Sequence, residues 1–205
     1  MTRYLFGLLI LGSVAFLGCE STSTTETARA SKPDKAAATV PVSELMAEAA
    51  APVVTLDVKN WDETLELVAQ HKGKIVVLDL WSTSCDPCMV EFPHLVELHK
   101  RHGGKLVCLS ASCDYAGIKS KPPESYRDHV LQFLTKQNAT FANVLLNVES
   151  DALFEKIELA SIPAVYVFGT DGKVAKRFDN DNAKSGDDFT YLKDVVPFVE
   201  KLLAD

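Results

Sequence analysis

Two cysteines three residues apart are the residues of this sequence best suited to chemistry. Cys85 and Cys88 enclose Asp86 and Pro87, at the point where an apolar segment passes into a helix-forming one. At a helix start, unpaired backbone N–H groups and the helix dipole stabilise a thiolate and lower the pKa of a cysteine such as Cys85. Pro87 suits the first helical turn, where its missing N–H would have had no partner. The motif therefore predicts a reversible disulfide whose thiolate attacks other disulfides.

The same cysteine pair has other interpretations. It is half of a zinc site if Cys108 and Cys113 supply the second half, although their spacing falls on a predicted strand. A purely structural disulfide is less favoured, because a three-residue bridge constrains the unfolded chain little. An exported metal-binding chaperone that uses the pair with a distant histidine, such as His129, is the alternative function. We expect instead a redox pair that needs neither a metal nor an organic cofactor.

A second candidate for chemistry is Asp79, which lies inside the apolar run 75–81. An ionised carboxylate buried there without a partner is costly, so burial is expected to raise its pKa. Asp79 would then exchange a proton with Cys88 as the disulfide opens and closes. The alternative is an edge strand from which Asp79 points to solvent.

The elements that must position these residues alternate between strands and helices from residue 53 onward. Asn60 is predicted to cap the first helix. Pro93 predicts a kink in the helix after the cysteines. Residues 170–173 predict a hairpin turn. Strands are expected over 53–58, 74–81, 106–111, 143–148, 164–168 and 174–178, and helices over 61–70, 85–101, 125–137, 151–159 and 188–203. This order predicts one three-layer α/β/α domain with a mixed central sheet over residues 53–205.

The remaining cysteines are expected to behave differently from each other. Cys108 and Cys113 would lie roughly 16 Å apart on an extended strand, beyond the distance of about 7 Å that a disulfide spans. Cys108 is predicted to be a core residue. Cys113 follows the strand at the sheet edge that also carries Cys85, so it is a candidate third redox thiol. Other rings are assigned by pattern: Trp61, Trp81 and Phe92 to the core, and His94, His99 and His102 to the solvated face of the long helix.

The first 52 residues differ from the rest in composition. Residues 1–18 carry Arg3 and an apolar run too short for a membrane span, which is typical of a secretory signal peptide. Gly18-Cys19 resembles the lipobox of bacterial lipoproteins, which implies that Cys19 is lipidated and holds an exported protein on a membrane of the cell envelope or periplasm. An ordinary signal peptide and an uncleaved anchor are the alternatives. Residues 19–52, rich in Ser, Thr and Ala, are expected to be a flexible tether.

The charge balance limits the classes of partner. The chain has 205 residues and a net charge of −7, and no run of Lys and Arg occurs in it. Nucleic acid is therefore disfavoured as the main partner, because phosphate binding depends on clustered positive charge. Among the five cysteines, lipidation of Cys19 would explain the odd count.

Residues 77–93 resemble the active-site segment of thioredoxin-like proteins, and most of all the exported, membrane-tethered thiol-disulfide oxidoreductases of the TlpA/ResA type. The segment reads Val-Leu-Asp-Leu-Trp-Ser-Thr-Ser-Cys-Asp-Pro-Cys-Met-Val-Glu-Phe-Pro. Asp79 matches the buried acid of that family and Trp81 the first tryptophan of its Phe-Trp-Ala-x-Trp-Cys run. Glu91 and Pro93 match its Glu-x-Pro. Together with 162–172, which resembles the family's cis-proline, strand and Asp-Gly turn, the resemblance covers residues 53–205 and implies a thioredoxin-like fold.

The resemblance also implies roles for the matching positions. Cys85 would be the nucleophile and Cys88 the resolving thiol, with a cis Pro163 beside the disulfide and the backbone of Ile162 bonding a substrate peptide. Further substrate contacts are expected from Trp81, Ser84, Asp86 and Pro87. The implied function is a membrane-tethered reductant of protein disulfides, which a membrane or soluble redox partner recycles. A peroxiredoxin-like peroxidase is disfavoured, because its Pro-x3-Thr-x2-Cys signature is absent.

One position departs from the family. Ser84 stands where the family has a tryptophan before the first cysteine, which removes an aromatic surface beside the sulfur. Asp86 adds negative charge between the cysteines, and we hypothesise that this charge makes the pair more reducing than a neutral residue would. Replacing Asp86 with Asn and measuring the reduction potential tests the hypothesis, and an unchanged or more reducing value would contradict it.

Overall fold

The chain is described by a computed structural model over residues 53–182 and 188–204. The predictions for the N-terminal part, namely the signal peptide 1–18, the lipid site at Cys19 and the tether 19–52, lie outside the described residues. None of the helices among the described residues is long and apolar enough to cross a membrane.

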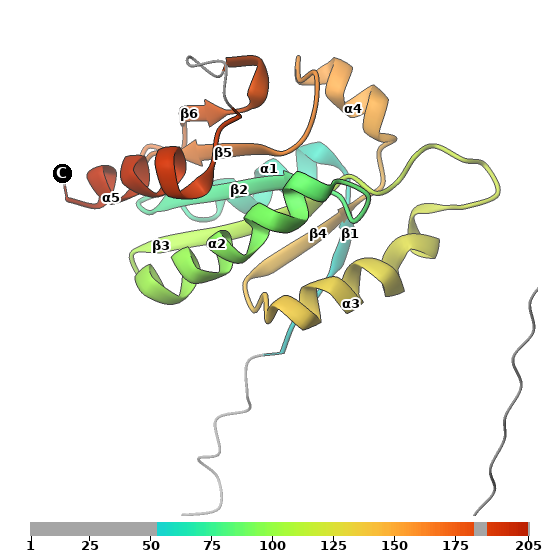
Figure 1. The fold of residues 1–205 in the computed structure, drawn as a ribbon, viewed down its shortest axis with the longest axis horizontal. Coiled ribbons are helices and arrows are strands. Elements are labelled where there is room, and N and C mark those ends of the chain that lie inside the picture. Colours follow the sequence, from blue (N-terminus) through green and yellow to red (C-terminus); the bar gives the residue numbers. More distant parts are fainter. Residues whose placement is uncertain (1–52, 183–187, 205) are drawn as a thin grey trace, which may run out of the picture. The chain divides into compact units, whose positions relative to one another are not determined.

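The described residues form one six-stranded sheet in the order β1-β4-β3-β2-β5-β6 (Figure 1). The strands are β1 (Asp57–Lys59), β2 (Ile75–Trp81), β3 (Leu106–Ser112), β4 (Ala142–Leu146), β5 (Ala164–Phe168) and β6 (Val174–Phe178). Strands β1, β4, β3 and β2 run parallel, whereas β5 is antiparallel to β2 and β6 is antiparallel to β5. The sheet is therefore mixed, as predicted, and its parallel part ends on a single edge.

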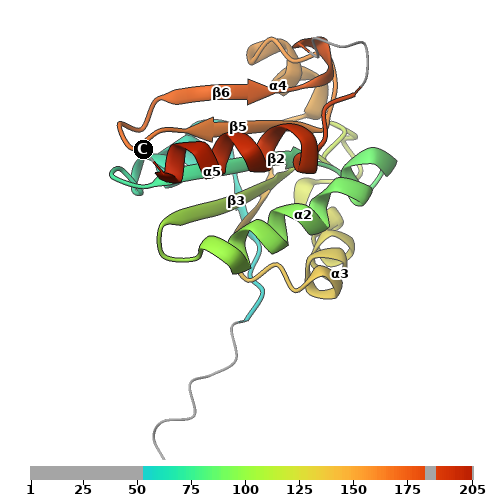
Figure 2. The same cartoon turned by 60° about the vertical axis from the view of Figure 1, so that its left-hand side comes forward.

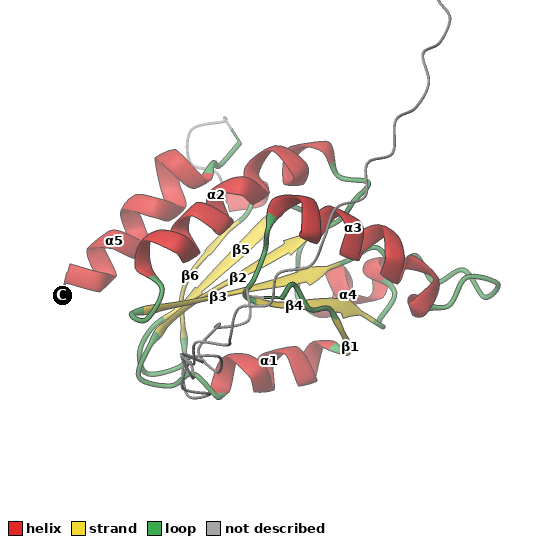
Figure 3. Cartoon of the chain, turned by 90° about the horizontal axis from the view of Figure 1, so that it is seen from below, coloured by secondary structure: helices red, strands yellow, loops and turns green. Residues whose placement is uncertain are grey.

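Helices cover both faces of the sheet and complete the three predicted layers (Figure 3). The helices are α1 (Trp61–Ala69), α2 (Asp86–His102), α3 (Arg127–Gln137), α4 (Ser150–Lys156) and α5 (Val196–Ala204). Phe92 of α2, Leu134 of α3 and Val199 of α5 are buried in one core cluster, while Val68 of α1 and Leu153 of α4 are buried in the other. Figure 2 shows α5 beside α2 on the first of these faces.

Local signals in the sequence account for several boundaries. Asn60 caps α1 through a reciprocal pair of hydrogen bonds with Glu63, in which each side chain accepts from the other residue's backbone N–H. The hairpin predicted at 170–173 joins β5 to β6. Pro93 lies inside α2, as expected.

Other boundaries differ from the sequence prediction because partners and caps decide them. In place of the strand expected over 53–58, the structure has the shorter β1, because β4 pairs with the chain only from Asp57 to Lys59. The helix expected over 188–203 starts later, with a π-helical turn η4 (Tyr191–Val195) that continues into α5. Thr190 sets this start, because its hydroxyl accepts a hydrogen bond from the backbone N–H of Lys193. Smaller differences are a 3₁₀ turn η2 (Pro123–Tyr126) ahead of α3, and the shorter α4 and β4.

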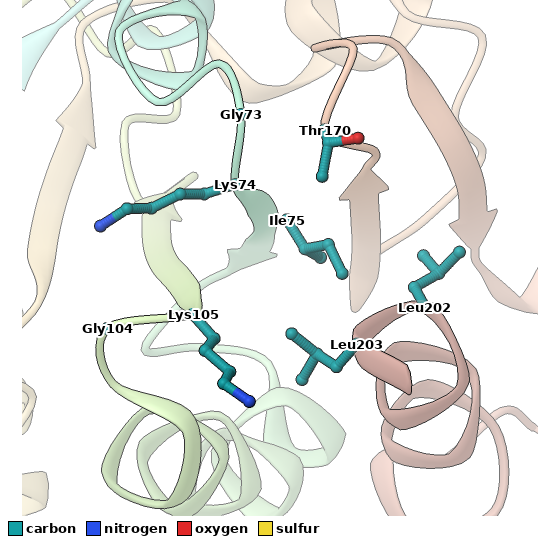
Figure 4. Close-up of a pocket in the computed structure, with 8 residues that line it drawn as sticks. All are labelled: Gly73, Lys74, Ile75, Gly104, Lys105, Thr170, Leu202 and Leu203. Atoms are coloured by element: carbon teal, nitrogen blue, oxygen red, sulfur yellow. The ribbon is translucent and has the colours of Figure 1, made fainter. Parts of the chain in front are cut away.

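A pocket of about 400 Å³ lies at the end of the sheet where β2 and β3 begin (Figure 4). Ile75, Leu202 and Leu203 supply its apolar side chains. In Figure 4 the side chain of Lys74 points away from them. Cys85 follows the opposite end of β2, so this pocket has no part in disulfide chemistry.

Candidate active site

Cys85 and Cys88 form a disulfide at the start of α2, with an S–S distance of 2.09 Å and a Cα–Cα distance of 5.3 Å. Cys85 is the N-cap of the helix, and its sulfur accepts a hydrogen bond from the backbone N–H of Cys88 at 3.3 Å. Cys85 is half-buried and Cys88 is buried. The sulfur of Cys85 thus lies where helix N–H groups stabilise negative charge, as the sequence predicted.

The segment before β5 brings a backbone carbonyl to the disulfide. The Ile162–Pro163 peptide bond is cis, as the resemblance implied, and the carbonyl oxygen of Ile162 lies 3.8 Å from the sulfur of Cys85. Antiparallel pairing of Leu80 with Ala164 places the start of β5 beside the end of β2. The two segments therefore meet at one edge of the sheet, although 77 positions separate them.

A carboxylate that the sequence analysis did not single out holds the loop before the cysteines. Asp114 follows β3 and accepts hydrogen bonds from the backbone N–H of Thr83 at 3.1 Å and 3.2 Å and from its hydroxyl. The hydroxyls of Ser82 and Ser112 also donate to this carboxylate, at 3.1 Å and 2.5 Å. The hydroxyl of Ser82 in turn lies 2.9 Å from that of Ser84. These bonds fix the chain between β2 and Cys85.

Asp79 lies at the centre of the sheet, in β2 between β3 and β5, and is 2% exposed. The alternative of an edge strand with a solvent-facing Asp79 is therefore wrong. Burial raises the pKa of its carboxyl from an ordinary value of 3.8 to about 7; a hydrogen bond from Tyr191 opposes this rise, and the charge of Glu91 adds to it. The hydroxyl of Tyr191 donates to Oδ2 of Asp79 at 2.9 Å, whereas Oδ1 is buried and has no hydrogen-bond partner among residues 53–182 and 188–204.

The residues expected to contact substrate divide into two groups. Ser84, Asp86 and Pro87 are exposed, and Ile162 is half-buried beside Cys85. Trp81 is fully buried instead, with its ring 4.8 Å from the rings of both Phe92 and Phe133. Its assignment to the core is therefore correct and its assignment to the substrate surface is wrong, because its position in β2 turns it under α2.

Cys108 and Cys113 are both free and buried, and they belong to the core clusters on opposite faces of the sheet. This arrangement agrees with the prediction that they do not bridge each other. Cys108 is a core residue, as expected. The backbone N–H of Cys113 donates to the carbonyl of Trp81 at 2.7 Å, but its thiol lies on the face of the sheet opposite to α2. Burial is the main cause that raises the pKa of both thiols.

The histidines of α2 are not on a fully solvated face, which corrects the sequence prediction. His94, His99 and His102 are half-buried. The ring of His99 lies 5.3 Å from that of Phe141, and the ring of His94 lies 6.5 Å from that of Tyr191. Neighbouring segments therefore cover the flanks of the helix. Among the described residues, no group of three or more His, Cys, Asp or Glu side chains is arranged to hold a metal ion.

Two site residues escaped the sequence analysis for different reasons. Asp114 follows β3, and the rule that parallel strands end at one edge would have placed it near Cys85. No comparable signal marks Tyr191, because 112 positions separate it from Asp79 and the two meet only in the folded chain, where η4 packs on α2.

The fold and the disulfide at the start of α2 define a thioredoxin-like thiol-disulfide oxidoreductase. The chain belongs to the Redoxin family, which residues 46–195 match. Thioredoxin H5 from Oryza sativa subsp. japonica is 33% identical over 118 residues, which are 54% of this chain and 78% of the rice protein. The thioredoxin-like protein YneN from Bacillus subtilis is 33% identical over 57 residues, which are 28% of this chain and 34% of that protein. The solved structure of a DsbF homologue from Corynebacterium diphtheriae is also similar, with a TM-score of 0.49 and 19% identity, and covers 65% of this chain and 75% of that one.

Proposed function

We propose that this chain is an exported, membrane-tethered oxidoreductase of the TlpA/ResA type that reduces disulfides of other proteins with its Cys85–Cys88 pair. The observation that carries the proposal is the position of the pair. Cys85 is half-buried at a helix start, its sulfur accepts a backbone N–H, and the carbonyl of Ile162 lies 3.8 Å away. A thiolate at such a helix start is stabilised and reactive.

In the proposed reaction, the Cys85 thiolate attacks one sulfur of a substrate disulfide. A mixed disulfide forms, and the first substrate thiolate leaves and takes a proton from water. Cys88 then loses its proton to Asp79, and its sulfur bonds to that of Cys85. The bond between Cys85 and the second substrate sulfur breaks, this second thiolate also takes a proton from water, and Asp79 returns its proton to water, so the substrate leaves as a dithiol and the protein as a disulfide. A redox partner that donates two electrons and two protons restores the dithiol.

The backbone around Pro163 is proposed to align the substrate. The half-buried Ile162 lies beside the sulfur of Cys85, so its backbone is available to an extended peptide whose disulfide approaches Cys85. The exposed Ser84, Asp86 and Pro87 are the proposed surface on the other side of the sulfur. Because Ser84 is small and polar, it gives this surface no aromatic ring.

The test compares the full chain with two cysteine variants in the reduction of a protein disulfide, for example that of insulin with dithiothreitol as electron donor. Cys85→Ser should reduce no more insulin than dithiothreitol alone. Cys88→Ser that is first reduced and then freed of dithiothreitol should accumulate a mixed disulfide between Cys85 and insulin, which mass spectrometry detects. Cys113→Ala is the matched control, since it removes a buried thiol on the other face of the sheet, and it should retain activity. Wild-type activity in Cys85→Ser would refute the mechanism.

The proposed tether has a test of its own. If Cys19 carries lipid, the protein isolated from membranes has an N-terminal peptide that begins at a diacylglyceryl-modified Cys19, and Cys19→Ala appears in a soluble fraction. An unmodified Cys19 in membrane-bound protein would contradict the tether but not the disulfide chemistry.

A further inference from the structure

Tyr191 forms a hydrogen bond with Asp79, although it lies far along the chain from the cysteine motif. It lies in η4, and its hydroxyl donates to Oδ2 of Asp79 at 2.9 Å. Both side chains are buried, with Tyr191 at 0% and Asp79 at 2% exposure. A hydrogen bond to a buried carboxylate is stronger than one in water and restricts the rotation of both partners.

We propose that Tyr191 is a positioning residue for disulfide exchange: its phenol holds Oδ2 of Asp79, so that Oδ1 remains available for the proton of Cys88. The inference deepens the proposed function and rests on it. Asp79 alternates in β2 with Val77 and Trp81, whose side chains belong to the core cluster that also contains Cys88, so Asp79 lies on the face of the sheet that α2 covers. Oδ1 has no hydrogen-bond partner in the described residues, and an unpaired buried acceptor is available for proton exchange.

Hydrogen bonds of the backbone around Tyr191 hold this residue in place. Its backbone N–H donates to Oε2 of Glu91 at 2.7 Å, and Thr190 caps the turn that contains it. Tyr191 therefore joins two acids, Glu91 through its backbone and Asp79 through its side chain. The carboxylate of Glu91 raises the pKa of Asp79, whereas the phenol lowers it.

The proton step that Tyr191 supports is the second half of the exchange. Oδ1 of Asp79 takes the proton of Cys88, and the Cys88 sulfur bonds to the Cys85 sulfur. The substrate sulfur leaves Cys85 as a thiolate that takes a proton from water, and Asp79 then returns its proton to water. The phenol keeps its own proton throughout, because burial and the neighbouring Asp79 raise its pKa well above the ordinary value. The other titratable groups around Asp79 and Tyr191 are Cys88, Glu91 and His94 of α2, Cys108 of β3 and Cys113 beyond it.

The test is the pH dependence of a single turnover, in which the full-length reduced protein reduces an insulin disulfide between pH 5 and 9. In the wild type, the resolving step should accelerate around pH 7, where Asp79 ionises. Tyr191→Phe removes one hydrogen bond from the carboxylate, so its inflection should move up by about one pH unit. At pH 6 the variant should therefore be about tenfold slower, with little change at pH 9.

Two further variants separate positioning from a general structural effect. Tyr166→Phe removes a phenol from a buried tyrosine on the other face of the sheet and should leave the inflection in place. Asp79→Asn should lose the inflection, and adding Tyr191→Phe to it should have no further effect on the profile. The inference would be overturned if Tyr191→Phe lowered the rate of the resolving step by the same factor at every pH and left the inflection where it is in the wild type. Activity in Cys85→Ser would overturn the proposed function instead.

A measurement on the wild type covers the case in which Tyr191→Phe does not fold. The buried hydroxyl proton of Tyr191 should give an NMR resonance that titrates together with the carboxyl carbon of Asp79. A hydroxyl proton that is absent, or that does not respond when Asp79 ionises, would overturn the inference.

Discussion

At the scale of single residues, burial gives Asp79 its distinctive chemistry. The carboxyl is 2% exposed and, in the part of the chain that the structure describes, has one hydrogen bond, from Tyr191. Burial raises its pKa to about 7, which makes it half ionised near neutral pH. A carboxyl with this pKa accepts and returns protons readily, whereas one at 3.8 would hold them too weakly. The same burial must cost the folded protein stability whenever Asp79 is ionised.

Replacing Asp79 with Asn should therefore change how stability depends on pH. Between pH 3.8 and about 7 the folded state keeps a proton on Asp79 that the unfolded chain has lost. Folding then becomes less favourable as pH rises through this range. The rise from 3.8 to about 7 corresponds to about 4 kcal/mol. The free energy of unfolding of Asp79→Asn, measured in urea on the oxidised protein, should rise relative to wild type by about this amount between pH 4 and pH 8.

The exposed Asp57 of β1 provides a matched control for this charge removal. Asp57→Asn should keep a nearly constant stability difference from wild type over the same pH range. Suppose that the difference in unfolding free energy between Asp79→Asn and wild type were also independent of pH. The pKa of Asp79 would then be the same in the folded and unfolded chain rather than near 7, and its proposed role as proton acceptor would fail.

At the scale of elements, the site is assembled where β2, β3 and β5 meet. Cys85 follows β2, Asp114 follows β3 and Pro163 precedes β5. The carboxylate of Asp114 joins two of these elements, because it accepts hydrogen bonds from the loop after β2 through Thr83 and Ser82. The loop that presents Cys85 is therefore fixed both by its own Ser82 and Thr83 side chains and by Asp114, which follows the neighbouring strand β3.

Asp114→Asn should loosen this loop. The substitution replaces one acceptor oxygen with an amide N–H₂ that faces donors, so a loss of about 1–3 kcal/mol in the free energy of unfolding is expected. Hydrogen exchange at the backbone N–H of Thr83 should accelerate, since this group donates to the carboxylate. Asp171→Asn is the control, because Asp171 accepts only one backbone N–H in the hairpin turn, that of Lys173. Unchanged exchange at Thr83 in Asp114→Asn would show that the loop does not depend on Asp114.

The elements that sequence predicts well are those whose signals are local. The apolar run of β2, the cap at Asn60 and the cysteine pair at the start of α2 are all visible within a few residues. The apolar pattern predicts a strand over 53–58, whereas the partner strand β4 pairs with the chain only over Asp57–Lys59. Trp81 was placed in the core from its pattern and on the surface from the resemblance, and its packing against Phe92 and Phe133 decides for the core. The contact between Tyr191 and Asp79 had no local signal at all.

At the scale of the whole domain, the sheet separates the thiols by function. Strand β3 carries Cys108 toward the face covered by α2, and the chain after it carries Cys113 toward the opposite face. Both are buried, so a reagent reaches them only when the domain opens. The pair at the start of α2 is different, because Cys85 is half-buried at the sheet edge. We therefore expect the redox chemistry to be confined to the Cys85–Cys88 pair.

This separation predicts the order in which the thiols react with an alkylating reagent. In the native oxidised protein, Cys108 and Cys113 should react with the reagent at least about 10³-fold more slowly than in urea, because alkylation of these buried thiols requires global unfolding. Burial raises the pKa of both thiols, which also lowers the fraction of reactive thiolate. After reduction of the Cys85–Cys88 disulfide, Cys85 should react immediately, while Cys108 and Cys113 remain protected. Mass spectrometry of the labelled peptides distinguishes these cysteines from one another and from Cys19. Labelling of Cys113 in the native protein at a rate close to that of Cys85 would contradict the separation, and would restore Cys113 as a third redox thiol at the edge of the sheet.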